Sequence, residues 1–109
     1  MNLIELKDLL DTVGYPVAYY QFIATNNKPV PDPPYITYLV AYSSNFMADG
    51  KVYKKIDNVQ VELYTVKKDL TAEAKLEAVL DNNEIPYQTT ETFIESEGLF
   101  QKIYEVRLI

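Results

Sequence analysis

Residues 35–65 read YITYLVAYSSNFMADGKVYKKIDNVQVELYT, which is two strand-like runs joined by a short connecting stretch. The first run, 35–43, is apolar or aromatic at almost every position, which is typical of a central strand covered on both faces. The second run, 51–66, alternates apolar with polar residues in its later half: Val59, Val61 and Leu63 against Asn58, Gln60, Glu62 and Tyr64. We therefore predict that Val59, Val61 and Leu63 face the core and that Gln60 and Glu62 face outward.

The two runs are joined around Asp49-Gly50, a favoured dipeptide for a two-residue hairpin turn. A calcium loop would need further oxygen ligands at alternating positions, and they are absent. A catalytic aspartate would need a partner, and none can be identified from the sequence. Val52 and Ile56 lie in the opposite phase to Val59, so a bulge near 57–58 is expected.

The flanking sequence predicts two helices and three further strands. Leucines at helical spacing follow Asn2, a good helix cap, and Gly14 ends that helix. Thr71 is expected to cap the second helix. The expected elements are a helix over 3–13, a strand over 17–23, a helix over 72–82 and strands over 87–95 and 100–109. The order α-β-β-β-α-β-β predicts an α+β domain spanning 1–109, with two helices on one face of a largely antiparallel sheet.

Composition limits the kinds of function. The chain has 109 residues, the size of one domain, with a net charge of −6 and no cysteine. An acidic chain is a poor candidate for non-specific binding to nucleic acid or anionic membranes. The absence of cysteine fits a reducing compartment, and no apolar run resembles a signal peptide or a membrane span. We expect a soluble protein made in the cytoplasm.

A catalytic or metal site is not predicted. The chain lacks histidine, the commonest general base and metal ligand. It also lacks cysteine, the source of a thiolate nucleophile and a further metal ligand. Its three glycines form no phosphate-binding loop. Acid–base chemistry by a pair of carboxylates stays open, if the fold brings two of these four residues together: Asp32, Asp49, Asp57 and Glu62. The expectation is a non-enzymatic protein without cofactor or metal.

Two segments have the features of protein-contact elements. The proline loop, residues 28–34, holds four prolines that favour an extended path and remove backbone donors: Pro29, Pro31, Pro33 and Pro34. The loop is either a contact element or only a rigid linker. The second segment is the shoulder of the hairpin, where large apolar residues flank the turn: Phe46, Met47, Val52 and Tyr53. They either fold back on the domain or wait for a partner.

The sequence resembles the tail terminator, or tail completion, proteins encoded in the head–tail joining gene clusters of long-tailed bacteriophages and prophages of Gram-positive bacteria. The similarity extends over nearly the whole chain. It rests on four stretches: PYI at 34–36, F-x-ADGK-x-Y at 46–53, VQ-x-ELYT at 59–65 and ETFIESE at 91–97.

The resemblance implies a structural virion protein made of a small sheet with flanking helices. In that family, subunits assemble into a hexameric ring that caps the tail tube and offers a surface to the head connector, and no catalytic residues are implied. DNA would pass through the ring without specific binding, which an acidic lumen favours. The implied partners are therefore further copies of the chain, the tail tube protein and the head connector. A head-completion stopper, a tail tube subunit and a small adaptor or binding module stay open as alternatives.

Overall fold

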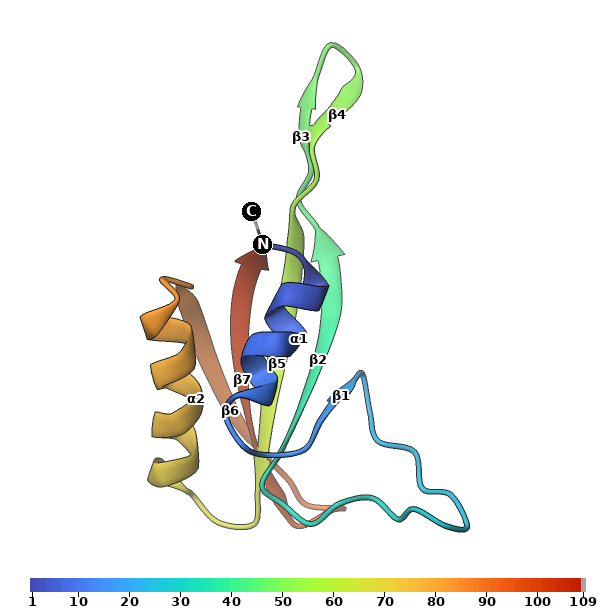
Figure 1. The fold of residues 1–109 in the computed structure, drawn as a ribbon, viewed down its shortest axis with the longest axis vertical. Coiled ribbons are helices and arrows are strands. Elements are labelled where there is room, and N and C mark those ends of the chain that lie inside the picture. Colours follow the sequence, from blue (N-terminus) through green and yellow to red (C-terminus); the bar gives the residue numbers. More distant parts are fainter. Residues whose placement is uncertain (109) are drawn as a thin grey trace.

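Five strands form the central sheet, in the order β1-β2-β5-β7-β6 (Figure 1). The computed structural model describes residues 1–108, apart from the side chains of Phe46, Val52 and Tyr53. β1 is parallel to β2, and the other neighbouring pairs are antiparallel. The strands span Val17–Tyr19 (β1), Tyr35–Ser43 (β2), Asp57–Thr65 (β5), Tyr87–Ile94 (β6) and Leu99–Leu108 (β7). The expected α+β fold with its largely antiparallel sheet is confirmed.

Both helices, α1 (Leu3–Asp11) and α2 (Leu70–Asn82), cover the same face of the sheet (Figure 1). Their apolar stripes supply fully buried leucines to one core: Leu6, Leu10, Leu76 and Leu80. Asn2 caps α1 as predicted, because its Oδ1 accepts the Glu5 N–H at 2.9 Å. The cap of α2 was predicted wrongly. Asp69 Oδ1, not Thr71, accepts the Ala72 N–H at 3.0 Å, so α2 begins earlier than expected.

The predicted phase of β5 is confirmed on its core side. Val59, Val61 and Leu63 are at most 1% exposed and belong to the same core cluster as the helix leucines. Gln60 lies on the helix-free face and is half-buried. Glu62 also lies there, but it is only 6% exposed, whereas the sequence suggested an outward, solvated carboxylate. Neighbouring polar side chains on the helix-free face cover it.

Two strands are shorter in the structure than the sequence predicts. The run 51–66 is divided into β4 (Lys51–Lys54) and β5, because β4 leaves the main sheet and pairs only with β3 (Phe46–Ala48). The expected bulge lies opposite Asn58, but the extra residue is Ala41 on β2. The predicted strand 17–23 ends at Tyr19, because Tyr20 takes a φ of 69°, which no extended strand accommodates.

The helices are short and amphipathic. α1 has 9 residues and α2 has 13. Within residues 1–108, neither helix offers the long apolar stretch that a membrane crossing requires.

Candidate functional site

The β3–β4 hairpin projects from the end of the sheet as an arm, here defined as residues 45–55 (Figure 1). Asp49 and Gly50 have φ values of 50° and 73°, so the predicted two-residue turn is confirmed. The arm lengthens the molecule, whose extents are 48 × 32 × 26 Å. The radius of gyration is 15.2 Å, against about 13 Å for a compact domain of this length. An isolated two-stranded hairpin is only marginally stable in water, so an arm of this kind suits a partner surface.

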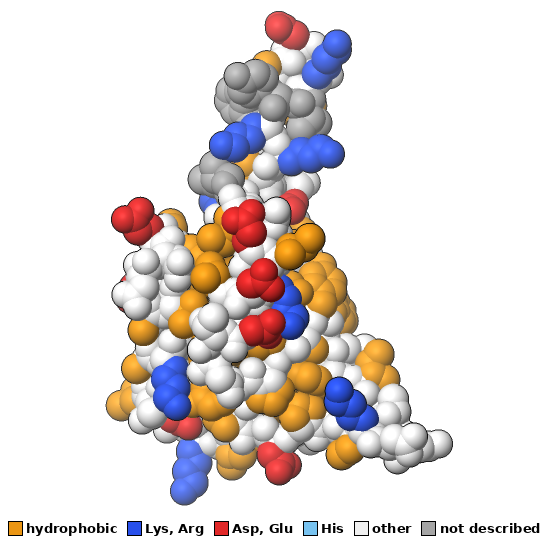
Figure 2. Space-filling model, in the orientation of Figure 1, with side chains coloured by type: hydrophobic (Ala, Val, Ile, Leu, Met, Phe, Trp, Pro, Cys, Tyr) orange, Lys and Arg blue, Asp and Glu red, His pale blue; other side chains and the backbone are white. Residues whose placement is uncertain are grey.

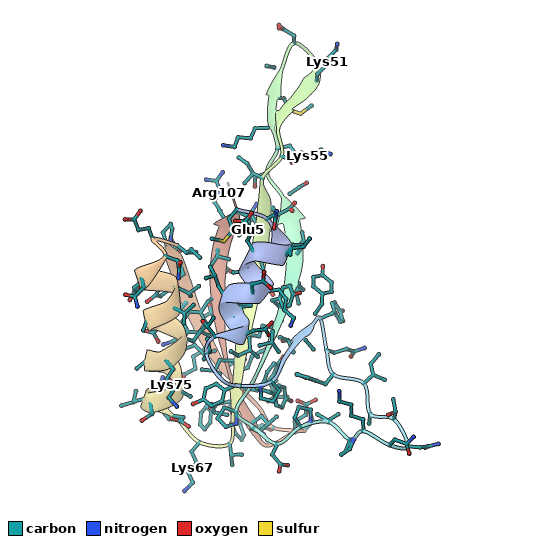
Figure 3. The ribbon with its side chains drawn as sticks, in the orientation of Figure 1. Glu5, Lys51, Lys55, Lys67, Lys75 and Arg107 are labelled. Atoms are coloured by element: carbon teal, nitrogen blue, oxygen red, sulfur yellow. The ribbon has the colours of Figure 1, made fainter. Side chains whose placement is uncertain are left out.

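The arm is basic, while the rest of the chain is acidic. It carries Lys51, Lys54 and Lys55 against a single acid, Asp49, a net charge of 3 − 1 = +2. The remainder of the chain therefore has −6 − 2 = −8. Figure 2 shows basic side chains along the arm and acidic ones on the body beneath it. In Figure 3, Lys51 near the tip and Lys55 near the base project away from the ribbon.

The predicted contact residues of the hairpin shoulder are described only in part. Met47 is 56% exposed and does not fold back on the domain. The side chains of Phe46, Val52 and Tyr53 lie outside the described part of the structure. The exposed thioether of Met47, among the lysines of the arm, gives the arm both apolar and cationic contact groups.

A second candidate surface is the outer edge of β6, the last strand of the sheet. Its eight residues pair with β7 in one unbroken register, and the six between Tyr87 and Ile94 are exposed. Among the strands that the structure describes, none pairs with the other side of β6. An edge of this length, with Glu91 as its single charge and without proline, lysine or a bulge, is open to pairing with another chain.

The edge lies within the most acidic part of the chain. Residues 81–98, here called the acidic edge segment, contain no Lys or Arg and five acidic residues: Asp81, Glu84, Glu91, Glu95 and Glu97. Asp81 and Glu84 lie at the C-terminal end of α2, where the helix dipole adds negative potential. A surface cavity of about 710 Å³ opens beside this end of the segment, and residues 83–88 line part of it.

The proline loop extends from the body at the end of the molecule opposite the arm (Figure 1). The two predicted contact segments are therefore not brought together. Pro29 is exposed, while Pro31, Pro33 and Pro34 are half-buried. The loop is attached at its base, since Phe22 contacts the ring of Tyr35 at a centroid distance of 5.3 Å. Whether the loop binds a partner stays a prediction.

A charged network joins α2 to the sheet. Glu73, only 6% exposed, accepts hydrogen bonds from Lys102 at 2.8 Å and from Lys68 at 3.0 Å. Burial opposes ionisation of this carboxyl, but the two lysines outweigh it and lower the pKa of Glu73. Tyr104 is fully buried, and its hydroxyl donates to Glu77 Oε2 at 2.8 Å. Burial and this acceptor raise the pKa of Tyr104. Every member has a partner, so the network serves to hold the helix in place.

A polar cluster lies on the helix-free face around Glu62. Its Oε2 accepts hydrogen bonds from the Tyr64 hydroxyl, at 2.8 Å, and from the Gln101 side-chain amide. Burial, helped by this carboxylate, raises the pKa of Tyr64 to about 12. The ring of Tyr64 stacks on Tyr35 at a centroid distance of 5.0 Å. These contacts explain why Glu62 is buried on a face that no helix covers.

The four carboxylates that could have formed an acid–base pair lie in three different segments of the chain. Asp49 is in the turn of the arm and Asp32 is in the proline loop. Asp57 and Glu62 are five residues apart on β5, which corresponds to roughly 17 Å along a strand. Among residues 1–108, no group of three or more metal-binding side chains is present.

Neither a protein-family model nor a curated protein matches the sequence. The basic charge of the arm and the acidic charge of the segment 81–98 were not among the predictions from the sequence. A count of charges along the chain would have found both, since 45–55 carries +2 and 81–98 carries −5.

Proposed function

We propose that this chain is a structural subunit of a phage virion, which assembles into a ring, caps the tail tube and joins it to the head connector. The observation that carries the proposal is the basic arm that projects from an acidic body. A hairpin that its own domain stabilises only weakly is expected in a protein that works in an assembly, where a partner can stabilise it. The arm also contains the F-x-ADGK-x-Y hairpin, one of the four stretches on which the resemblance to tail terminators rests.

The distribution of contact groups also supports a ring. The arm, the acidic edge segment and the proline loop are three different surfaces of one small domain. A contact between two different surfaces of identical subunits is heterologous, and such contacts generate closed rings or open filaments. A terminator needs a closed ring with two further faces, one for the tube and one for the head.

The strongest alternative is a subunit of the tail tube itself. It would use the same arm and the same heterologous contact, but it would stack into continuous tubes rather than one ring. A head-completion stopper would bind the connector without the tube. A small adaptor would act as a monomer or dimer. These roles differ in what the protein binds.

Electron microscopy of purified components tests the proposal. Tail tubes that lack a cap are mixed with the purified protein, and the tube ends are imaged and averaged. We expect one ring at one end of each tube and no ring along its length. Long tubes formed by this protein alone would favour the tube subunit. Binding to isolated connectors but not to tubes would favour the stopper. Binding to neither would contradict a role in head–tail joining.

A further inference from the structure

We infer that the arm, residues 45–55, of one subunit binds along the β6 edge of a second copy, within the acidic edge segment 81–98. The inference rests on the proposed function as a ring subunit, and it names the two surfaces that would meet. The arm belongs to one end of the subunit and β6 forms the outer edge of its sheet. A contact between them is therefore head-to-tail.

Charge complementarity selects a second copy as the occupant. The arm carries +2 and the acidic edge segment carries −5, without a single Lys or Arg. Glu91 is bridged to Lys68 at 2.8 Å, and the other four acids of the segment, two before β6 and two after it, flank the strand. The lysines of an arm laid along β6 would thus meet carboxylates at both ends of the strand.

Backbone chemistry selects the edge rather than another acidic surface. The outer side of β6 presents backbone N–H and C=O groups that lack a strand partner among the described residues. Each strand of the two-stranded arm likewise has one free side. Addition of a strand to an open edge is a common mode of protein recognition, in which main-chain hydrogen bonds supply affinity. The outer face of α1 also bears acids, Glu5 and Asp8, but it offers no strand edge.

Engineered cysteines provide a direct test, because the chain has none of its own. One partner carries Met47→Cys in the arm, and the other carries Thr92→Cys on the exposed side of β6. The matched control replaces Thr92→Cys by Ile4→Cys, which is 74% exposed beside the acids of α1. The rate of disulfide formation between the two partners is followed at physiological salt, where bulk attraction is screened beyond about 8 Å.

We expect the pair at positions 47 and 92 to cross-link about tenfold faster than the control pair. Reversing the charge of the arm by Lys51→Glu, Lys54→Glu and Lys55→Glu should abolish the difference in cross-linking rate between the two pairs. Adding Glu84→Lys, Glu95→Lys and Glu97→Lys to the edge partner should restore it. Equal rates for the two pairs, or a rate that ignores the arm lysines, would overturn the inference.

A second measurement separates this contact from binding of DNA by the arm. Fluorescence anisotropy of a short labelled duplex reports whether the three lysines bind phosphate. If they govern binding of the duplex and not the cross-link, the arm is a DNA contact and the inference is wrong. The proposed function fails independently: a fast, lysine-dependent cross-link without rings on tail tubes would leave the contact standing and remove the terminator role.

Discussion

Lys102 Nζ lies 2.8 Å from Glu73 Oε1 and so ties the fourth strand of the sheet to the covering helix α2. The side chain of Glu73 is 8% exposed, and its second oxygen, Oε2, lies 2.8 Å from Lys68 Nζ. Because both lysines hold the pKa of Glu73 below its ordinary value of 4.5, the folded protein binds this proton less readily than the unfolded chain. The resulting stabilisation is present above about pH 4.5 and is lost as the pH falls through the lowered pKa.

Glu73→Gln should therefore lower the free energy of unfolding at pH 7 by about 1.5–3 kcal/mol, the contribution of hydrogen bonds to a charged group. The variant should also lose less stability than the wild type between pH 5 and pH 3. Urea titrations at several pH values measure both effects. Glu95→Gln, in the exposed turn after β6, is the control and should stay within about 0.5 kcal/mol of the wild type. Parallel pH curves for the wild type and Glu73→Gln would refute the assignment.

The cap of α2 provides a second test. Asp69→Ala removes the acceptor of the Ala72 N–H and should cost about 0.5–2 kcal/mol. Thr71→Ala, two residues into the exposed first turn, should change stability by less than about 0.5 kcal/mol. Thermal or chemical unfolding compares the two variants. A larger loss for Thr71→Ala would restore the cap that the sequence suggested.

The register of β5 makes a third prediction. Val61 is fully buried between Tyr38 and Tyr104, its neighbours on the adjoining strands. Val61→Asp would bury a charge without a partner and should cost several kcal/mol, on the order of 3–5. Gln60→Lys, on the helix-free face, should stay within about 0.5 kcal/mol. Similar losses for the two substitutions, measured in urea, would contradict the register.

The proline loop is expected to contribute more to assembly than to stability. Pro31→Gly with Pro33→Gly loosens the loop and adds entropy to the unfolded chain, which corresponds to about 0.4–1 kcal/mol per site. We expect a folded monomer by circular dichroism and weaker ring formation on tail tubes. Normal ring formation by the double variant would show that the loop is a rigid linker.

Most of the fold was predictable because local signals agreed with one another. Asn2, the Asp49-Gly50 turn and the alternation at 59–63 each specify their structure through nearby residues alone. Where the sequence failed, a long-range contact decided the outcome. Glu62 reads as a solvated residue, yet Gln101, 39 positions away, covers and binds it. Similarly, nothing within 51–66 reveals that β4 leaves the sheet while β5 stays.

The candidate site was predictable only in part. The Asp49-Gly50 turn and its flanking strands predict the hairpin of the arm. For Met47 the sequence leaves two alternatives, folding back on the domain or contact with a partner, and the structure shows it exposed. The β6 edge could not be predicted from the residues 87–94, because the position of a strand within a sheet depends on the pairing of all the others. The lysines of the arm were visible in the sequence, but their meaning depends on the projection that the fold gives them.

Under the proposed function, the central claim is tested most directly by removal of the gene from a phage that encodes it. The length of every tail, and whether a head is attached, is measured by electron microscopy of lysates. A ring that caps the tube predicts tails of irregular, excessive length beside filled heads that never join them. Supplying the wild-type chain in trans should restore both length and joining. Tails of normal length attached to heads would contradict the claim, and tails of normal length beside unjoined heads would favour a head-side connector instead.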